Sequence, residues 1–139
     1  YSQRKFEIMA RVIDTDIFPF LLKKDTRAEL YKPHLYGHFL FLSFMTVAEL
    51  ERWANLYNWG QNKINLLENS LKRYVIQHSN RDICKIWGEI MTESKRKGLN
   101  VSISDAWIAA TAISLQIPLV TNNEKDFQKI KALTIISEK

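Results

Sequence analysis

Short apolar runs alternate with amphipathic stretches along the chain, and this alternation predicts strands separated by helices. The predicted strands are the runs 11–14, 38–44, 117–121 and 133–136. The first is followed by a helix that opens at Asp16, which is placed to cap it, with Pro19 in the first turn. Further helices are predicted over 47–58, 64–75, 83–97 and 104–112, and from about 124. Strands alternating with helices at this spacing predict an α/β fold with a parallel sheet covered on both faces.

The two middle helices, 64–75 and 83–97, are predicted to pack as an antiparallel pair, and the second should end at Gly98. Because no internal repeat, low-complexity tract or Gly/Ser linker interrupts the sequence, we expect a single domain over residues 9–139. Residues 1–8 lack the pattern of a signal peptide and are interpreted as an N-terminal extension or an expression remnant.

Composition narrows the class of protein. With 139 residues, 46% of them hydrophobic, the chain is long enough to form its own core without disulfides. The single cysteine, Cys84, lies in an apolar helical pattern and is expected to be a buried thiol in a reducing compartment, which favours the cytoplasm. The longest apolar stretch, 39–47, is too short to cross a membrane. A net charge of +5 favours an anionic partner.

Four acidic residues follow the strands of the predicted sheet. Asp14 ends the first strand, Glu49 and Asp105 lie near the starts of helices, and Asp126 follows the strand that ends at Thr121. The carboxyl ends of parallel strands meet at one edge, where ligands bind. Two carboxylates about 5 Å apart repel by roughly 3 kcal/mol at an effective dielectric constant of about 20. A divalent cation with a preference for oxygen ligands, Mg²⁺ or Mn²⁺, would relieve this repulsion.

Most of these acids also have a purely structural interpretation. Asp16 is a candidate N-cap, and Glu49 completes a capping-box pattern with Thr46. Asp105 stands where a helix dipole favours a negative charge. A structural role accounts less well for Asp14, because a carboxylate at the end of an apolar strand, on this edge of a parallel sheet, usually serves a ligand. The case for a site depends on the convergence of the acids and not on any one of them.

Four segments together resemble the PIN-domain ribonucleases, and most closely the VapC-type toxins. They are Ile-Asp-Thr-Asp (13–16), Thr-Val-Ala-Glu-Leu (46–50), Ser-Asp-Ala-Trp-Ile-Ala-Ala-Thr-Ala (104–112) and Leu-Val-Thr-Asn-Asn-Glu-Lys-Asp-Phe (119–127). The third and fourth segments are the specific ones. The resemblance extends from about Met9 to the C-terminus, in the family's order and spacing.

The resemblance implies a three-layer α/β/α PIN-like domain whose acidic pocket binds Mg²⁺ or Mn²⁺ and hydrolyses RNA. It also implies a toxin inhibited by a cognate antitoxin, and a homodimer. Asp14, Glu49 and Asp105 match the principal acids of the family, and Asp126 matches the fourth. The chain departs from the family at Asp16, where Asn is common.

A second departure is at Asn123, where many members have an acid. Thr121 and Asn123 are interpreted as polar supports, and Asp16 as a water-mediated metal contact. We expect one or two cations on Asp14, Asp105 and Asp126 to activate a water and neutralise the scissile phosphate.

Glu49 would ligate or orient that water. A histidine base is not expected: His34 and His38 have the spacing of a metal pair, but Pro33 and Gly37 argue against a helix there, which favours ordinary loop and strand roles.

Two basic clusters are candidates for contacts with RNA phosphates, whether the substrate is tRNA, mRNA or rRNA. They are Lys23, Lys24 and Arg27, and Lys95, Arg96 and Lys97. The alternative is that these cations complement helix dipoles. Trp87 is expected in the core, whereas Trp53 and Trp59 are candidates for an apolar dimer or antitoxin surface.

Two other functions fit parts of the sequence. Asp14-Thr15-Asp16 also resembles the nucleophile motif of haloacid-dehalogenase-type phosphatases, but the chain lacks the late pair of adjacent acids that this chemistry needs. The other alternative is a catalytically silent PIN-like module that binds RNA or protein.

Overall fold

The computed structural model describes residues 10–22 and 26–138, so the prediction for residues 1–8 lies outside the described part of the chain. Its elements, in chain order, are β1 (Ala10–Ile13), the 3₁₀ helix η1 (Thr15–Ile17), α2 (Phe18–Leu22), α3 (Arg27–Leu35), β2 (Phe39–Ser43), α4 (Phe44–Leu56), α5 (Gln61–Leu71), β3 (Val75–Gln77), α6 (Arg81–Lys97), α7 (Ile103–Leu115), β4 (Leu119–Val120), α8 (Glu124–Phe127) and β5 (Ile135–Ile136).

The five strands form one sheet in the order β3-β2-β1-β4-β5, and every pairing is parallel. The central strand is β1, in which Val12 lies opposite Phe41 on one side and Leu119 on the other. All carboxyl ends therefore point to the same edge. The parallel α/β sheet expected from the sequence is confirmed.

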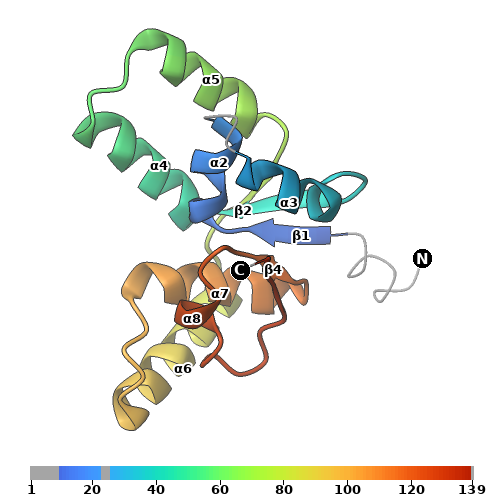
Figure 1. Ribbon diagram of the computed structural model, residues 1–139. Coiled ribbons are helices and arrows are strands. Elements are labelled where there is room, and N and C mark those ends of the chain that lie inside the picture. Colours follow the sequence, from blue (N-terminus) through green and yellow to red (C-terminus); the bar gives the residue numbers. More distant parts are fainter. Residues whose placement is uncertain (1–9, 23–25, 139) are drawn as a thin grey trace.

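Helices cover both faces of this sheet and enclose two hydrophobic cores. Val12 and Leu119 point to one face, where they pack with α6, α7 and α8, and the adjacent residues Ile13 and Val120 point to the other, toward α2 to α5. Figure 1 shows these helix layers above and below the sheet. Consecutive strand residues serve opposite cores because side chains alternate along a strand.

Helix α4 begins three residues earlier than the sequence predicts. Its N-cap is Ser43, whose hydroxyl accepts from the Met45 N–H at 3.1 Å. Thr46 therefore lies inside the helix, and the capping box with Glu49 is wrong. Ser43 is both the last residue of β2 and the N-cap of α4, so no loop separates the strand from the helix.

The expected antiparallel pairing of the two middle helices is also wrong. Strand β3, missed in the sequence, comes between them, so α5 lies beside α4 on one face and α6 packs on α7 on the other (Figure 1). Leu67 of α5 and Trp87 of α6 consequently belong to different cores. The C-terminus of α6 is confirmed at Gly98, which adopts a left-handed conformation with φ of 64°.

The predictions made for His34 and for Cys84 are wrong. Pro33 lies inside α3, so His34 is helical and does not have a loop or strand role; its Nε2 lies 3.1 Å from Glu138 Oε1. Pro33 has no N–H to donate to the Glu29 carbonyl, and the helix ends two residues after it. Cys84 is exposed on α6 and not buried, because Ile83 occupies the core position of that turn.

Within residues 10–22 and 26–138, no helix is both long enough and apolar enough to span a membrane.

Candidate active site

Asp14 lies at the carboxyl end of the central strand and is fixed by bonds to two segments. Its Oδ1 accepts from the Thr15 N–H at 2.8 Å, and its Oδ2 accepts from the Thr121 hydroxyl at 2.7 Å. Its backbone N–H donates to Val120 O at 2.9 Å, which ties it to β4. The side chain is 4% exposed. Thr121 is therefore a direct hydrogen-bond donor to Asp14.

This buried position makes ionisation of Asp14 costly. Burial raises the pKa of Asp14 well above its usual range, and the negative charges of Asp16 and Asp105 raise it further, while the bond from Thr121 opposes the shift. Such a carboxyl has a strong tendency either to bind a proton or to lie beside a cation.

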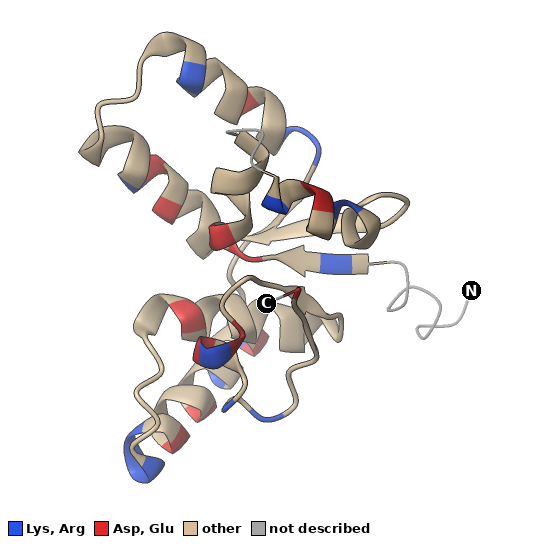
Figure 2. Cartoon of the chain, in the orientation of Figure 1, with Lys and Arg blue, Asp and Glu red and all other residues tan. Residues whose placement is uncertain are grey.

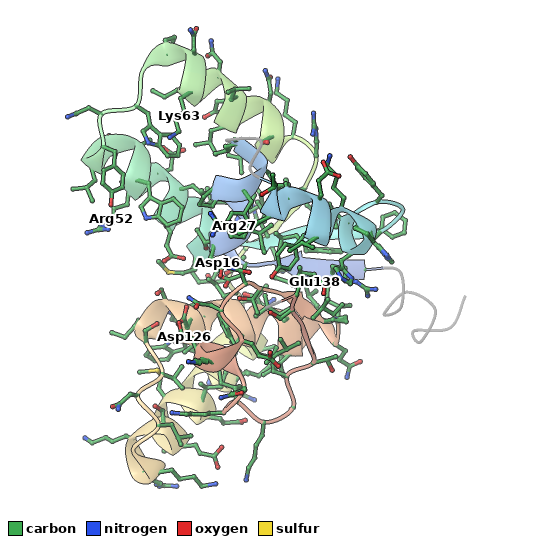
Figure 3. All side chains as sticks on the ribbon, viewed as in Figure 1. Asp16, Arg27, Arg52, Lys63, Asp126 and Glu138 are labelled. Atoms are coloured by element: carbon green, nitrogen blue, oxygen red, sulfur yellow. The ribbon has the colours of Figure 1, made fainter. Side chains whose placement is uncertain are left out.

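Asp16 is not the helix N-cap that the sequence suggests. It lies within η1, whose N-cap is Asp14, and its carboxylate accepts from the Asn122 N–H at 3.2 Å. Burial raises the pKa of Asp16, whereas hydrogen bonds with Asp14 and Asn122 lower it in part. The charge of Asp126 also raises this pKa, which places the two acids near one another; Figure 3 shows them on segments from opposite layers.

Glu49 projects from the second turn of α4 toward β1. The Thr15 hydroxyl donates to Glu49 Oε1 at 2.8 Å and lies 3.0 Å from the hydroxyl of Thr46. Burial raises the pKa of Glu49, the bond from Thr15 lowers it, and the charge of Asp16 raises it again. Thr15 thus holds Glu49 at the acidic edge, and the positive charge of Arg52 also lowers the pKa of Glu49.

Asp105 lies in the first turn of α7, which Ser102 caps by accepting the Asp105 N–H at 3.1 Å. Partial burial raises the pKa of Asp105 to about 6, and the charges of Asp126, Glu49 and Asp16 contribute to the increase. The start of α7 is further fixed by Trp87, which donates to Ile103 O at 3.3 Å and stacks on Trp107 with ring centroids 4.6 Å apart.

Five acids from the two helix layers lie near the carboxyl edge of the sheet. They are Asp14, Asp16, Glu49, Asp105 and Asp126. Figure 2 shows the acidic segments of η1, α7 and α8 around the carboxyl edge of the sheet. The four acids predicted as catalytic, Asp14, Glu49, Asp105 and Asp126, are among them, with Asp126 exposed on α8. The negative charges of neighbouring acids contribute to the raised pKa values of Asp14, Asp16, Glu49 and Asp105, as expected for carboxylates at one edge of the sheet.

The donor chemistry of this cluster fits a hard divalent cation. Its ligating atoms are carboxylate oxygens, which Mg²⁺ and Mn²⁺ prefer. Burial first, and the negative charge of neighbouring acids second, raise the pKa values of Asp14 and Asp105, and a bound cation would offset both effects. In the described part of the chain, however, no three His, Cys, Asp or Glu side chains are already gathered into a metal-ligand group. The acids surround a common region but do not converge on one point.

The remaining predicted residues have mixed outcomes. The Asn123 N–H donates to the Thr121 hydroxyl at 2.9 Å, whereas its side chain makes no capping bond. Lys23 and Lys24 lie outside the described residues. Arg27 is exposed, with its guanidinium 4.2 Å from the centre of the Phe20 ring.

Lys95, Arg96 and Lys97 are exposed at the end of α6, where Lys97 lies 3.1 Å from Glu93. Trp87 packs at the edge of one core, partly buried, in agreement with its expected role. Trp53 and Trp59 pack at the edge of the other core.

Sequence reasoning missed two supports of the site. Tyr31, buried in α3, donates to Asn122 Oδ1 at 2.7 Å, and its hydroxyl also accepts from the Glu138 N–H at 3.2 Å. Asn122 in turn holds Asp16, as described above. Thr15 was overlooked as well, although its position between two acids was a signal that it could orient them.

Comparison with known proteins agrees with this geometry. The model of the PIN domain family matches residues 11–133. Ribonuclease VapC1 of Haemophilus influenzae strain R2866 is 32% identical over 127 residues, which cover 90% of this chain and 95% of the relative. The chain therefore belongs to the PIN-domain family.

Solved structures place it near one branch of that family. The chain is similar to a structure of VapBC-1 from nontypeable Haemophilus influenzae, with a TM-score of 0.79, 31% identity, and coverage of 93% of this chain and 98% of that one. It is also similar to VapBC2 of Rickettsia felis bound to a promoter DNA fragment, with a TM-score of 0.84, 26% identity, and coverage of 94% and 100%.

Proposed function

We propose that this protein is a metal-dependent ribonuclease of the VapC type, acting as the toxin of a toxin–antitoxin pair. The observation that carries the proposal is the gathering of four buried or partly buried carboxylates, with the exposed Asp126 beside them, at the carboxyl edge of the parallel sheet. The four are Asp14, Asp16, Glu49 and Asp105. The similarity to Ribonuclease VapC1 supports RNA as the substrate.

Asp14, Asp105 and Asp126 are the residues that would hold Mg²⁺ or Mn²⁺. When bound, such a cation lowers the pKa of a water and neutralises charge on a phosphodiester. Asp14 is the fixed member of this set, because both of its oxygens are positioned by Thr15 and Thr121.

Glu49 is held by Thr15 at the rim of the cluster, where its carboxylate can orient an attacking water and accept a proton from it. Asp16 adds negative charge beside Asp14, and the Asn122 N–H fixes its direction. Asn123 supports the site through the backbone bond to Thr121, not through a ligand of its own.

The partner proposals have separate supports. A cognate antitoxin is proposed because the similar solved structures are VapBC assemblies. A groove of about 540 Å³ near the ends of α4 and α5 is lined by Trp53, Tyr57 and Trp59 and is a candidate surface for it. A homodimer and a cytoplasmic location stay predictions.

Cleavage of total tRNA and of a generic single-stranded RNA by the purified protein tests the function. We expect cutting with Mg²⁺ or Mn²⁺ that disappears in EDTA and in Asp105→Asn. The matched control is Asp82→Asn, because Asp82 is exposed on α6 and bonds Ser114, near the opposite end of α7. This variant should cut like the wild type.

Two outcomes would contradict the proposal. Cutting that survives Asp105→Asn would show that the acidic cluster is not responsible. A folded protein, free of antitoxin, that cuts neither RNA would instead favour the catalytically silent module.

A further inference from the structure

A second charged region lies on the same side of the sheet as α7, and its lining includes none of the five acids of the candidate active site. It is a groove of about 840 Å³ between α6 and residues 128–132, the segment that directly follows α8. Its lining includes five cationic side chains and two acids. The cations are Lys85, Arg96, Lys97, Lys129 and Lys131. We call this region the basic groove.

The acids of the basic groove neutralise only part of this charge. Glu93 lies 3.1 Å from Lys97 and 3.8 Å from Lys131, so one carboxylate serves two ammonium groups. Within residues 10–22 and 26–138, Arg96 and Lys129 have no ion pair, and both are exposed. The groove therefore carries cations that are available to an anionic ligand.

Beneath the charges the groove has a rigid apolar floor. Leu99 and Ile113 line it, together with the buried Ile130, which packs into the core next to Phe127. Ile130 anchors the 128–132 segment because its N–H also donates to Phe127 O at 3.0 Å. Lys129 and Lys131 stand on either side of this anchor and are held at the rim.

Helix α8 connects the acidic cluster to the basic groove along the chain. This four-residue helix carries Asp126 and the exposed Lys125, and the chain runs from it into Lys129 and Lys131. In Figure 2 basic residues mark α8, the segment after it and the lower end of α6, below the acidic segments. A polyanion at the acidic cluster is repelled by carboxylates, and cations along its path offset that repulsion.

We propose that the basic groove binds backbone phosphates of an RNA strand that crosses α8 from the acidic cluster. This inference rests on the proposed ribonuclease function. The cations contact phosphates without reading sequence, and the apolar floor accepts sugar and base faces. RNA is favoured over an acidic peptide because α8, which carries Asp126, leads within three residues to Lys129 at the edge of the groove, so one extended polyanion can reach both.

The test compares two double variants of the full chain that each lose one arginine and one lysine. Arg96→Gln with Lys129→Gln removes two unpaired cations of the basic groove, one from each of its walls. Lys72→Gln with Arg73→Gln removes exposed cations after α5, on the other side of the sheet. Both are placed in an Asp105→Asn background, and binding of a fluorescein-labelled 20-nucleotide oligouridylate is measured by anisotropy at several salt concentrations in Mg²⁺.

Loss of two phosphate contacts should weaken binding roughly 10- to 30-fold near 0.1 M salt and make the log–log salt slope shallower by about 1.4. The control should bind within about threefold of its parent, as expected for charges outside the path. Equal binding by the groove variant and the control would overturn the proposal.

The same variants separate this inference from its alternatives. If the groove variant keeps oligouridylate binding but loses a labelled decaglutamate peptide, the groove is a protein-docking surface and the RNA assignment is wrong. If the intact chain cuts no RNA, the proposed function fails, yet the binding comparison still decides whether the groove holds RNA.

Discussion

The acids from the two layers of the site differ in how firmly they are held. Asp14 is buried with both carboxylate oxygens bonded, and Asp16 accepts a backbone N–H from Asn122. Asp105 is half-buried on α7, and Asp126 is exposed on a four-residue helix, where no hydrogen bond or ion pair within the described ranges restrains its carboxylate. One side of the site is prearranged, whereas the other can adjust.

This difference explains why five neighbouring acids do not already form a metal-ligand group in the described part of the chain. Mutual repulsion keeps the less constrained carboxylates apart. A cation would have to draw Asp105 and Asp126 toward the fixed Asp14. Asp14 and Asp16, which follow β1, should therefore determine where a cation binds. Asp105 on α7 and Asp126 on α8 should determine how tightly it binds.

The largest loss of activity is expected when Asp14, the most firmly held acid, is replaced. Asp14→Asn should lower kcat/KM for RNA about 1,000-fold, because it removes the charged oxygen around which the site is built. Asp126→Asn should lower it only about tenfold, because the exposed side chain can be replaced by water. Steady-state cleavage of one RNA by both variants measures the ratio.

Equal losses of kcat/KM in Asp14→Asn and Asp126→Asn would show that the site does not have a fixed and an adjustable side. Circular dichroism of both proteins controls for folding.

A smaller effect should follow from loosening Asp14 without removing it. Thr121→Val deletes the hydroxyl that donates to Asp14 Oδ2 and accepts the Asn123 N–H. We expect activity to fall about 10- to 100-fold and the free energy of unfolding to fall by about 1–3 kcal/mol. Thr121→Ser keeps the hydroxyl and is the matched control. Near-normal activity of the valine variant would show that the bond is not needed to position Asp14.

The smallest effect concerns the pH dependence of stability. The pKa of Asp105 is about 6 in the fold and near 3.9 in an unfolded chain. Because the folded value is the higher one, the protonated carboxyl stabilises the fold at low pH, and this contribution is lost as pH rises through about 6.

In EDTA the free energy of unfolding should fall by about 1 kcal/mol more in wild type than in Asp105→Asn between pH 4.5 and 7.5, after allowance for partial exposure. Urea unfolding at both pH values measures this difference. Identical pH profiles for the two proteins would show that neither burial nor the neighbouring acids raise the pKa of Asp105 in the folded protein.

The sequence was most informative where one physical rule acted alone. Apolar runs predicted the strands that end just before Asp14 and Thr121. Parallel topology alone then places the ends of these strands at one edge of the sheet. The sequence failed where two rules competed. The three-residue β3 was missed because Val75 continues the helical spacing of α5, and α3 was missed because Pro33 usually marks a helix boundary.

The supports of the site were harder to predict than the acids. A tyrosine in a missed helix gives no sign that its hydroxyl reaches Asn122, 91 positions later in the chain. The start of α4 was displaced by three residues, and with it the interpretation of Thr46 and Glu49 changed from a capping box to a hydrogen-bonded group facing β1. Such contacts depend on tertiary packing and leave no local pattern.

The stacked indoles of Trp87 and Trp107 give the site a built-in optical reporter. Their planes are inclined by 13° at a centroid separation of 4.6 Å, close enough for their electronic transitions to couple. The pair joins α6 to the first turns of α7, two residues from Asp105. Any shift of α7 against α6 would change the near-ultraviolet circular dichroism and tryptophan emission, so motion of the adjustable side can be followed without a label.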